Sequence, residues 1–128
     1  DDLNDPLITE EHILSFDWAS NQELEEMIST SLRVNDFLIG FFLSQGIRLI
    51  DFKLEYGRIW KQNEQIIMIG DEISPDNCRL WDVNTNKKLD KDRFRQNLGE
   101  VDHAYKEVAF RLGVLSLKEY KKAVKNEI

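Results

Sequence analysis

Apolar and polar residues alternate with two different periods along the chain. Between Ser20 and Gly46 the apolar residues recur every three or four positions, which predicts one long amphipathic helix packed on a sheet. Ser20 and Glu23 have the spacing of a capping box, and Gly46 is typical of the position just after a helix. The positions that follow the helical period are Leu24, Met27, Ile28, Ser31, Val34, Leu38 and Phe41.

After Gly46 the period changes to two, which predicts strands. Residues 47–60 form one strand or a strand pair broken near Gly57, and residues 65–71 form a buried strand. The polar segment 61–64 between them predicts an antiparallel hairpin.

The strand segment 51–57 carries charged and apolar residues at alternate positions. Because successive strand side chains point to opposite faces, Asp51, Lys53 and Glu55 share one face. The other face carries Ile50, Phe52, Leu54 and Tyr56.

The register of the hairpin decides whether two acidic residues meet. If Glu55 pairs directly with Asp71, both carboxylates lie on one face with Cβ atoms roughly 5 Å apart. A slip of one residue would put them on opposite faces. We predict the pairing of Glu55 with Asp71, which requires an odd-length turn or a bulge.

The residues after 72 indicate a functional loop followed by two helices. Residues 73–92 have little periodicity and many turn residues, as in loops that carry function. Residues 100–112 predict a helix, and Ser116 and Glu119 form a second capping box before a short final helix. The expected fold class is α+β, a largely antiparallel sheet with flanking helices.

Composition narrows the class of protein. The chain has 128 residues, enough for one domain, and a net charge of −7 from 17 basic and 24 acidic residues. This balance argues against a nucleic-acid partner, and no apolar run reaches the roughly 20 residues that span a membrane.

The single cysteine, Cys78, excludes an internal disulfide and favours a reducing compartment, so we expect a cytoplasmic protein. The opening at Asp1, without an initiator Met, predicts a piece of a longer protein.

Glu55 and Asp71 suit a magnesium ion. Mg²⁺ prefers oxygen ligands, is often held by one or two carboxylates, and takes phosphate oxygens and water at its other positions. The alternative is that they are surface acids, each paired with an Arg or Lys. Lys53 is equally open to two interpretations: an ion-pair partner of Asp51 and Glu55, or a point charge on a phosphate or carboxylate.

Six sequence segments carry a specific resemblance. The segment Leu49–Gly57 reads apolar-apolar-Asp-x-Lys-x-Glu-aromatic-Gly and resembles the signature of SAICAR synthetases (phosphoribosylaminoimidazole-succinocarboxamide synthases), which are enzymes of purine biosynthesis. The resemblance continues through residues 70–76 and 78–82, 89–96, 1–6 and 104–113.

The resemblance implies an ATP-grasp-like ligase. ATP would phosphorylate the carboxylate of carboxyaminoimidazole ribonucleotide, and the amine of L-aspartate would then displace phosphate to form an amide. The family's pattern places Glu55 and Asp71 on Mg²⁺ against the ATP phosphates and Lys53 near the carboxylate being activated. Asp51 would orient Lys53 or bind a second metal, and Asp1 would lie close to the imidazole substrate.

The same resemblance implies residues that bind substrate. Arg79 matches a family position that contacts the ribonucleotide 5′-phosphate; its alternative is an ion pair with Asp76 or Asp82. Two further residues, Arg95 and Lys91, fall near the substrate carboxylates, and Ser74 is either a ligand contact or a turn residue.

The chain departs from the family pattern at its front. The Gly- and Lys-containing strand that covers the ATP phosphates and an Arg-x-x-x-Gly-Ser-type motif are both missing. We therefore expect residues 1–128 to be the C-terminal Mg-ATP- and substrate-binding portion of a SAICAR synthetase, without the N-terminal lid domain. We expect this portion to be inactive alone and the enzyme to be a homo-oligomer. Two alternatives remain: an acidic interaction or assembly module, and another ATP-dependent phosphotransferase of related fold.

Overall fold

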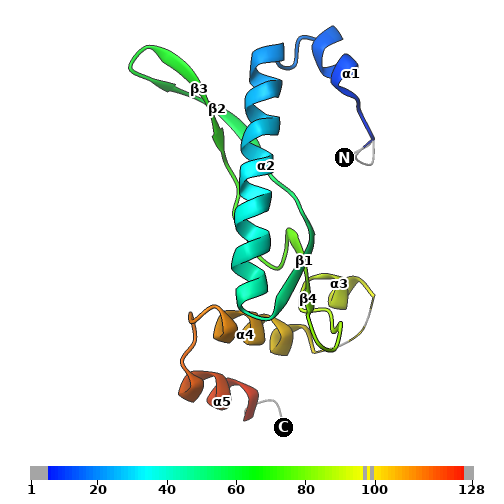
Figure 1. The fold of residues 1–128 in the computed structure, drawn as a ribbon, viewed down its shortest axis with the longest axis vertical. Coiled ribbons are helices and arrows are strands. Elements are labelled where there is room, and N and C mark those ends of the chain that lie inside the picture. The colour runs from blue at the N-terminus through cyan, green and yellow to red at the C-terminus, as the bar shows by residue number, and fades with distance from the viewer. Residues whose placement is uncertain (1–5, 97, 99, 126–128) are drawn as a thin grey trace.

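The fold is built around one long helix. The structure, a computed structural model, describes residues 6–96, 98 and 100–125. Figure 1 shows a hairpin lying beside the N-terminal half of the long helix, while the other strands and the C-terminal helices gather around its far end. The elements in chain order are α1 (Glu10–Ser15), α2 (Asn21–Ser44), β1 (Ile47–Phe52), β2 (Tyr56–Lys61), β3 (Glu64–Ile69), β4 (Cys78–Asp82), α3 (Asp92–Arg95), α4 (Val101–Arg111) and α5 (Leu117–Lys125).

The predicted limits of α2 are confirmed. The Glu23 backbone N–H donates to Ser20 Oγ at 3.2 Å, and the Ser20 N–H donates to the Glu23 carboxylate at 2.7 Å. After the helix, Gly46 takes a φ of +68° and turns the chain into β1.

The predicted buried face of α2 is correct only in part. Leu24 and Leu38 are buried, but Ile28 and Phe41 are 44% and 41% exposed, whereas Phe42 is buried. The helical period alone does not show how many neighbouring positions of the helix surface the core covers. The core packs against a narrow side of the C-terminal half of α2, so neighbours of the predicted stripe remain exposed.

Strand β4 lies inside the segment 73–92, which the pattern predicts as a loop. It pairs antiparallel with β1, so this part of the expectation is wrong. Five residues flanked by Asp and Asn carry too little periodicity to reveal a strand. The register shifts between Leu49 and Asp51, which leaves Ile50 as an extra residue. This bulge places Asp51 opposite Arg79 and leaves Ile50 41% exposed.

The β2–β3 hairpin forms with a register that differs from the predicted one. Lys61 pairs with Glu64 across a two-residue turn whose φ values, +50° and +68°, are typical of a type I′ turn. This turn places Glu55 opposite Gly70, whose N–H donates to the Glu55 carbonyl at 2.9 Å. The predicted pairing of Glu55 with Asp71 is therefore wrong by one residue.

The strand structure is interrupted at residues 53–55, between β1 and β2. The interruption comes before the predicted position near Gly57. Burial still alternates there, with Asp51, Lys53 and Glu55 exposed and the residues between them half-buried. The expected alternation of exposed charged residues with half-buried apolar residues is thus confirmed from residue 51 to 56.

One core joins α2, the β1–β4 pair and α4. Its fully buried side chains include Ile47, Leu80 and Leu89, each with 0% exposure. The predicted C-terminal helices are confirmed as α4 and α5, and Ser116 and Glu119 form the expected capping contacts. Among the residues that the structure describes, no helix is both long and apolar enough to cross a bilayer.

Candidate active site

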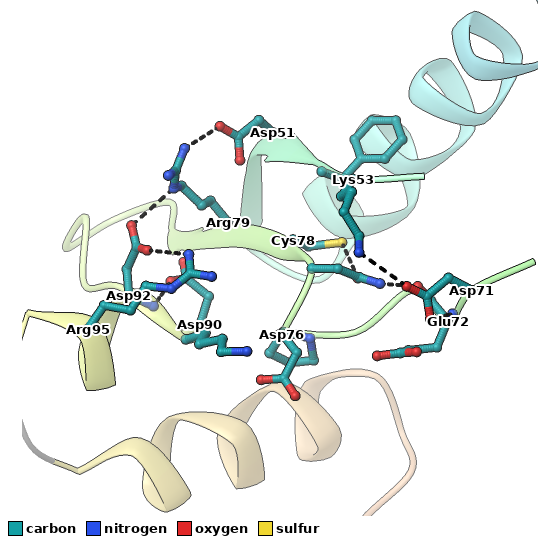
Figure 2. Close-up of a pocket in the computed structure, with 14 residues that line it drawn as sticks. Asp51, Lys53, Asp71, Glu72, Asp76, Cys78, Arg79, Asp90, Asp92 and Arg95 are labelled. Atoms are coloured by element: carbon teal, nitrogen blue, oxygen red, sulfur yellow. Dashed lines mark hydrogen bonds and ion pairs between the residues drawn. The ribbon is translucent and has the colours of Figure 1, made fainter. Parts of the chain in front are cut away.

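An open cavity of about 460 Å³ lies where the end of β1, the segment 71–77, β4 and the start of α3 meet. Figure 2 shows its charged side chains converging from these four segments. Six of the nine predicted site residues line it: Asp51, Lys53, Asp71, Arg79, Lys91 and Arg95. Glu55 lies beside the cavity through its contact with Lys53.

Glu55 and Asp71 converge on the Lys53 ammonium. Lys53 Nζ forms an ion pair with Glu55 Oε1 and lies 3.5 Å from Asp71 Oδ2. The hydrogen bond to Glu55, followed by the charges of both acids, raises the pKa of Lys53. Both carboxylates thus pair with one lysine, which is the ion-pair alternative that the sequence left open. They reach Lys53 from positions outside the paired strands, so the strand register does not decide which way their side chains point.

Asp71 is also held by its own chain. The Glu72 N–H donates to Asp71 Oδ1 at 2.9 Å. Hydrogen bonding with Glu72, and then the Lys53 ammonium, lower the pKa of Asp71, so its carboxylate stays charged at neutral pH. Glu55 and Asp71 thus supply a pair of carboxylates around a cation position, a donor set that fits Mg²⁺ completed by phosphate and water oxygens. No group of three or more His, Cys, Asp or Glu suited to a metal occurs in the described part of the chain.

A chain of ion pairs forms the opposite wall of the cavity. Arg79 Nη1 lies 2.5 Å from Asp51 Oδ2, and Arg79 Nε lies 3.1 Å from Asp92 Oδ2. Asp92 also contacts Arg95 at 3.4 Å. Figure 2 shows this ladder of alternating acids and arginines. Asp51 therefore orients Arg79, whereas the resemblance implied that it either orients Lys53 or binds a second metal.

The alternative ion pairs considered for Arg79 are not formed. Asp82 Oδ2 instead accepts from Arg111 at 2.7 Å, and Asp76 Oδ1 accepts from the Tyr105 hydroxyl at 2.6 Å. Arg79 keeps 46% of its side chain exposed, so its guanidinium is open to an anion in the cavity.

Ser74 shapes a turn in the structure. Its Oγ accepts from the Asp76 N–H at 3.2 Å, and its carbonyl accepts from the N–H groups of Asn77 and Cys78. It is absent from the residues that line the cavity. Lys91 lines the cavity and is fixed through its N–H, which donates to the Pro75 carbonyl at 3.0 Å. Asp1 lies outside the described residues.

Sequence reasoning missed two acids of this site, Asp90 and Asp92. Asp90 is 1% exposed, and its carboxylate accepts from the N–H groups of Leu80 at 2.7 Å and Asp92 at 2.8 Å. Burial raises the pKa of Asp90. Asp90 ties α3 to β4, so Asp92 reaches Arg79. An Asp two residues before a helical segment is a local capping signal that could have revealed Asp90.

The sequence also matches a known family. A model of the SAICAR synthetase family matches residues 1–112, most of the chain. The chain belongs to the SAICAR synthetase family.

Relatives with this name confirm the assignment. The chain is 61% identical over 115 residues to the phosphoribosylaminoimidazole-succinocarboxamide synthase of Rhodospirillum centenum, covering 90% of this chain and 45% of the relative. The corresponding protein of Acidiphilium cryptum is 58% identical over the same shares. The chain thus spans about half the length of the curated relatives it matches.

Solved SAICAR synthetases share the fold. The crystal structure of the Ehrlichia chaffeensis enzyme superposes with a TM-score of 0.85 at 50% identity, over 90% of this chain and 48% of that one. A SAICAR synthetase (Type-2) solved in complex with ADP gives 0.82 at 39% identity, again over 90% and 48%. The expected α+β SAICAR-synthetase-like architecture is confirmed, with two separate two-stranded antiparallel sheets in the described part.

Proposed function

We propose that this chain is the Mg-ATP- and substrate-binding portion of an enzyme that joins L-aspartate to the carboxylate of carboxyaminoimidazole ribonucleotide at the expense of ATP. The product is the succinocarboxamide of purine biosynthesis. The observation that carries the proposal is the convergence of Glu55 and Asp71 on one cation position beside a cavity that also holds Arg79 and Arg95.

The two acids serve the nucleotide end of the cavity. Magnesium bound there would neutralise charge on the ATP phosphates, which is the main requirement of phosphoryl transfer. Glu55 and Asp71 supply its oxygen ligands and fix where the terminal phosphate lies. Lys53, which lines the same cavity, offsets the repulsion between that phosphate and the substrate carboxylate.

The arginine wall serves the ribonucleotide end. Arg79 presents a planar fork that suits a 5′-phosphate, and Asp51 and Asp92 hold that fork in one orientation. The residues assigned to the substrate carboxylates, Arg95 and Lys91, lie on the same cavity. Ser74 acts through the turn that carries Asp76, and Asp1 is retained as a residue near the imidazole on the family resemblance alone.

The setting of the enzyme is also part of the proposal. We infer a cytoplasmic homo-oligomer in which residues 1–128 form the C-terminal portion and an N-terminal lid completes the ATP pocket. The relatives' greater length supports this division. Without a lid the cavity is open to water, so residues 1–128 alone should release phosphate at no more than background rate when given all three substrates.

Binding of Mg-ATP tests the proposed function. Isothermal titration of residues 1–128 should show binding that is lost in Glu55→Gln and in Asp71→Asn. Glu64→Gln is the matched control, because Glu64 is an exposed acid at the far end of the hairpin. Equal binding in all four proteins would refute the assignment of the metal site. Absence of binding in the unchanged chain would favour the assembly-module alternative.

A second assay separates the ligase from a phosphotransferase of related fold. The full-length enzyme that contains this chain should consume aspartate in proportion to phosphate released. Phosphate release that does not depend on aspartate would favour the phosphotransferase.

A further inference from the structure

Lys53 occupies the position that the proposed function gives to a metal ion. Its ammonium forms an ion pair with Glu55 Oε1 and lies 3.5 Å from Asp71 Oδ2, so both carboxylates already face a cation. Figure 2 shows the Lys53 side chain extending from the end of β1 toward Asp71. Two acids that would repel each other are thus held together by a charge from the same chain.

An ammonium and a divalent cation compete for the position between these two carboxylates. Each carboxylate has about four lone-pair sites, but Lys53 Nζ lies between Glu55 and Asp71, where a Mg²⁺ ion bound to both acids would also lie. Two positive charges within a few ångströms also repel each other. We therefore expect a metal that binds Glu55 and Asp71 together to displace Lys53.

The displaced side chain has room to move into the cavity. Lys53 is 59% exposed, lines the cavity and has a flexible four-carbon stem. The arginines of the opposite wall are already held, Arg79 by Asp51 and Asp92, and Arg95 by Asp92. Movement of Lys53 therefore adds a positive charge that faces an anionic ligand.

We propose that Lys53 is an internal counter-cation that holds Glu55 and Asp71 together before metal binding and turns into the cavity when the divalent cation arrives. The proposal rests on the proposed function, because it takes Glu55 and Asp71 as the metal ligands. The proposal predicts an order of events. The Lys53 ammonium can contact the substrate carboxylate only after a metal ion has bound to Glu55 and Asp71.

Binding of Mn²⁺ alone tests the competition without catalysis. Free Mn²⁺ is followed by its electron paramagnetic resonance signal, with no nucleotide present. Lys53→Met removes the competing charge and should bind Mn²⁺ about three- to tenfold more tightly than the unchanged chain, the range expected when exposed ion pairs are removed. Lys53→Arg keeps the charge and should bind within about twofold of the unchanged chain.

Lys91→Met is the matched charge control. It removes one positive charge from the lining of the same cavity but leaves the pairing of Lys53 intact. Its Mn²⁺ affinity should rise by less than about twofold, the size of a general charge effect. Equal gains in Lys53→Met and Lys91→Met would overturn the displacement, as would any loss of affinity in Lys53→Met.

The control Glu55→Gln separates this inference from the proposed function. One outcome would support the metal site and refute the displacement of Lys53. In that outcome the unchanged chain binds Mn²⁺, Glu55→Gln abolishes Mn²⁺ binding, and Lys53→Met leaves the Mn²⁺ affinity unchanged. If Glu55→Gln has no effect on Mn²⁺ binding, or no protein binds Mn²⁺, both fail. Nuclear magnetic resonance of the Lys53 Cε and Nζ atoms during a Mg²⁺ titration gives a second readout: a shift toward the values of free lysine supports displacement, and unchanged shifts at saturation overturn it.

Discussion

Arg79 on β4 and Asp51 on β1 face each other across the strand pair, with Nη1 and Oδ2 separated by 2.5 Å. The bulge at Ile50 creates this pairing, because regular pairing would have placed Asp51 opposite Cys78. A local irregularity of the backbone thus fixes the direction of the arginine that we assign to the ribonucleotide phosphate.

Arg79→Lys should weaken binding of the ribonucleotide substrate about tenfold, because lysine keeps the charge and loses the bidentate fork. Isothermal titration measures this change. Arg48→Lys on the exposed side of β1 is the control and should bind normally. A parallel loss of Mg-ATP binding in Arg79→Lys would contradict a specific role at the phosphate.

Tyr105→Phe should lower the free energy of unfolding by about 1 kcal/mol, because its hydroxyl donates to Asp76 at 2.6 Å and joins α4 to the segment that lines the cavity. Urea unfolding gives the value. Burial and the Asp76 carboxylate raise the pKa of Tyr105, so the hydroxyl is a donor throughout the neutral range. Tyr120→Phe, which removes a hydroxyl from α5, is the control. An equal loss of unfolding free energy in Tyr120→Phe would contradict a specific contribution from the hydrogen bond between Tyr105 and Asp76.

Asp82→Asn should destabilise the chain by about 2 kcal/mol at pH 7, because the half-buried Arg111 loses one of its two carboxylate partners and keeps Glu107. Hydrogen bonds from Thr85, and then from Arg111 and the backbone, hold the pKa of Asp82 well below its usual range.

The sign of the pH dependence follows from that lowered pKa. The stabilisation is fully present above the unfolded-state pKa of about 3.9 and is lost as the pH falls toward the folded-state pKa. The difference between Asp82→Asn and the unchanged chain should therefore shrink between pH 5 and pH 2. Urea midpoints across this range test it, with the exposed Asp36→Asn as control. A difference that stays constant with pH would refute the electrostatic origin.

The hairpin turn should accept a stabilising change. Gln62 and Asn63 both have positive φ, which Asn-Gly adopts with less strain than Gln-Asn. The double change Gln62→Asn and Asn63→Gly should raise stability by about 1 kcal/mol, or a few degrees in the melting temperature. Calorimetry measures it, and Asn63→Ala should act in the opposite direction. A loss of stability in the double variant would show that the turn has another geometry.

Cys78 should react slowly with thiol reagents. It is buried, and desolvation raises its pKa to about 11. At pH 8 about one molecule in a thousand would carry the reactive thiolate, against about a quarter for a free cysteine, so the rate should fall at least about 100-fold. Colorimetric titration before and after urea unfolding compares the two states. Rapid reaction of the folded chain would contradict the buried position.

Local sequence signals predicted α2, α4 and α5, although not the short helices α1 and α3. A capping box involves residues three positions apart, so Ser20 with Glu23 and Ser116 with Glu119 reveal helix starts without any knowledge of the fold. Lys53 and Asp71 were identified from strand alternation and Arg79 from the family resemblance, and the structure brings all three to one cavity.

Pairings between distant residues could not be predicted in the same way. The hairpin register depends on a two-residue turn at Gln62 and Asn63, where a change of one residue moves every partner. The strand β4 was missed because its partner β1 lies more than 25 residues away, and pairing rather than local propensity makes it a strand.

The sequence by itself determined the boundaries of α2, the start of α5, the alternation of charge from Asp51 to Glu55 and the set of acids and cations available for chemistry, because each depends on residues close together in the chain. Only the tertiary structure decided which charges meet: Lys53 with Glu55 and Asp71, and Arg79 with Asp51 and Asp92. The physical reason is that ion pairing acts over a few ångströms, and the bulge in β1, the break before β2 and the buried Asp90 set those distances.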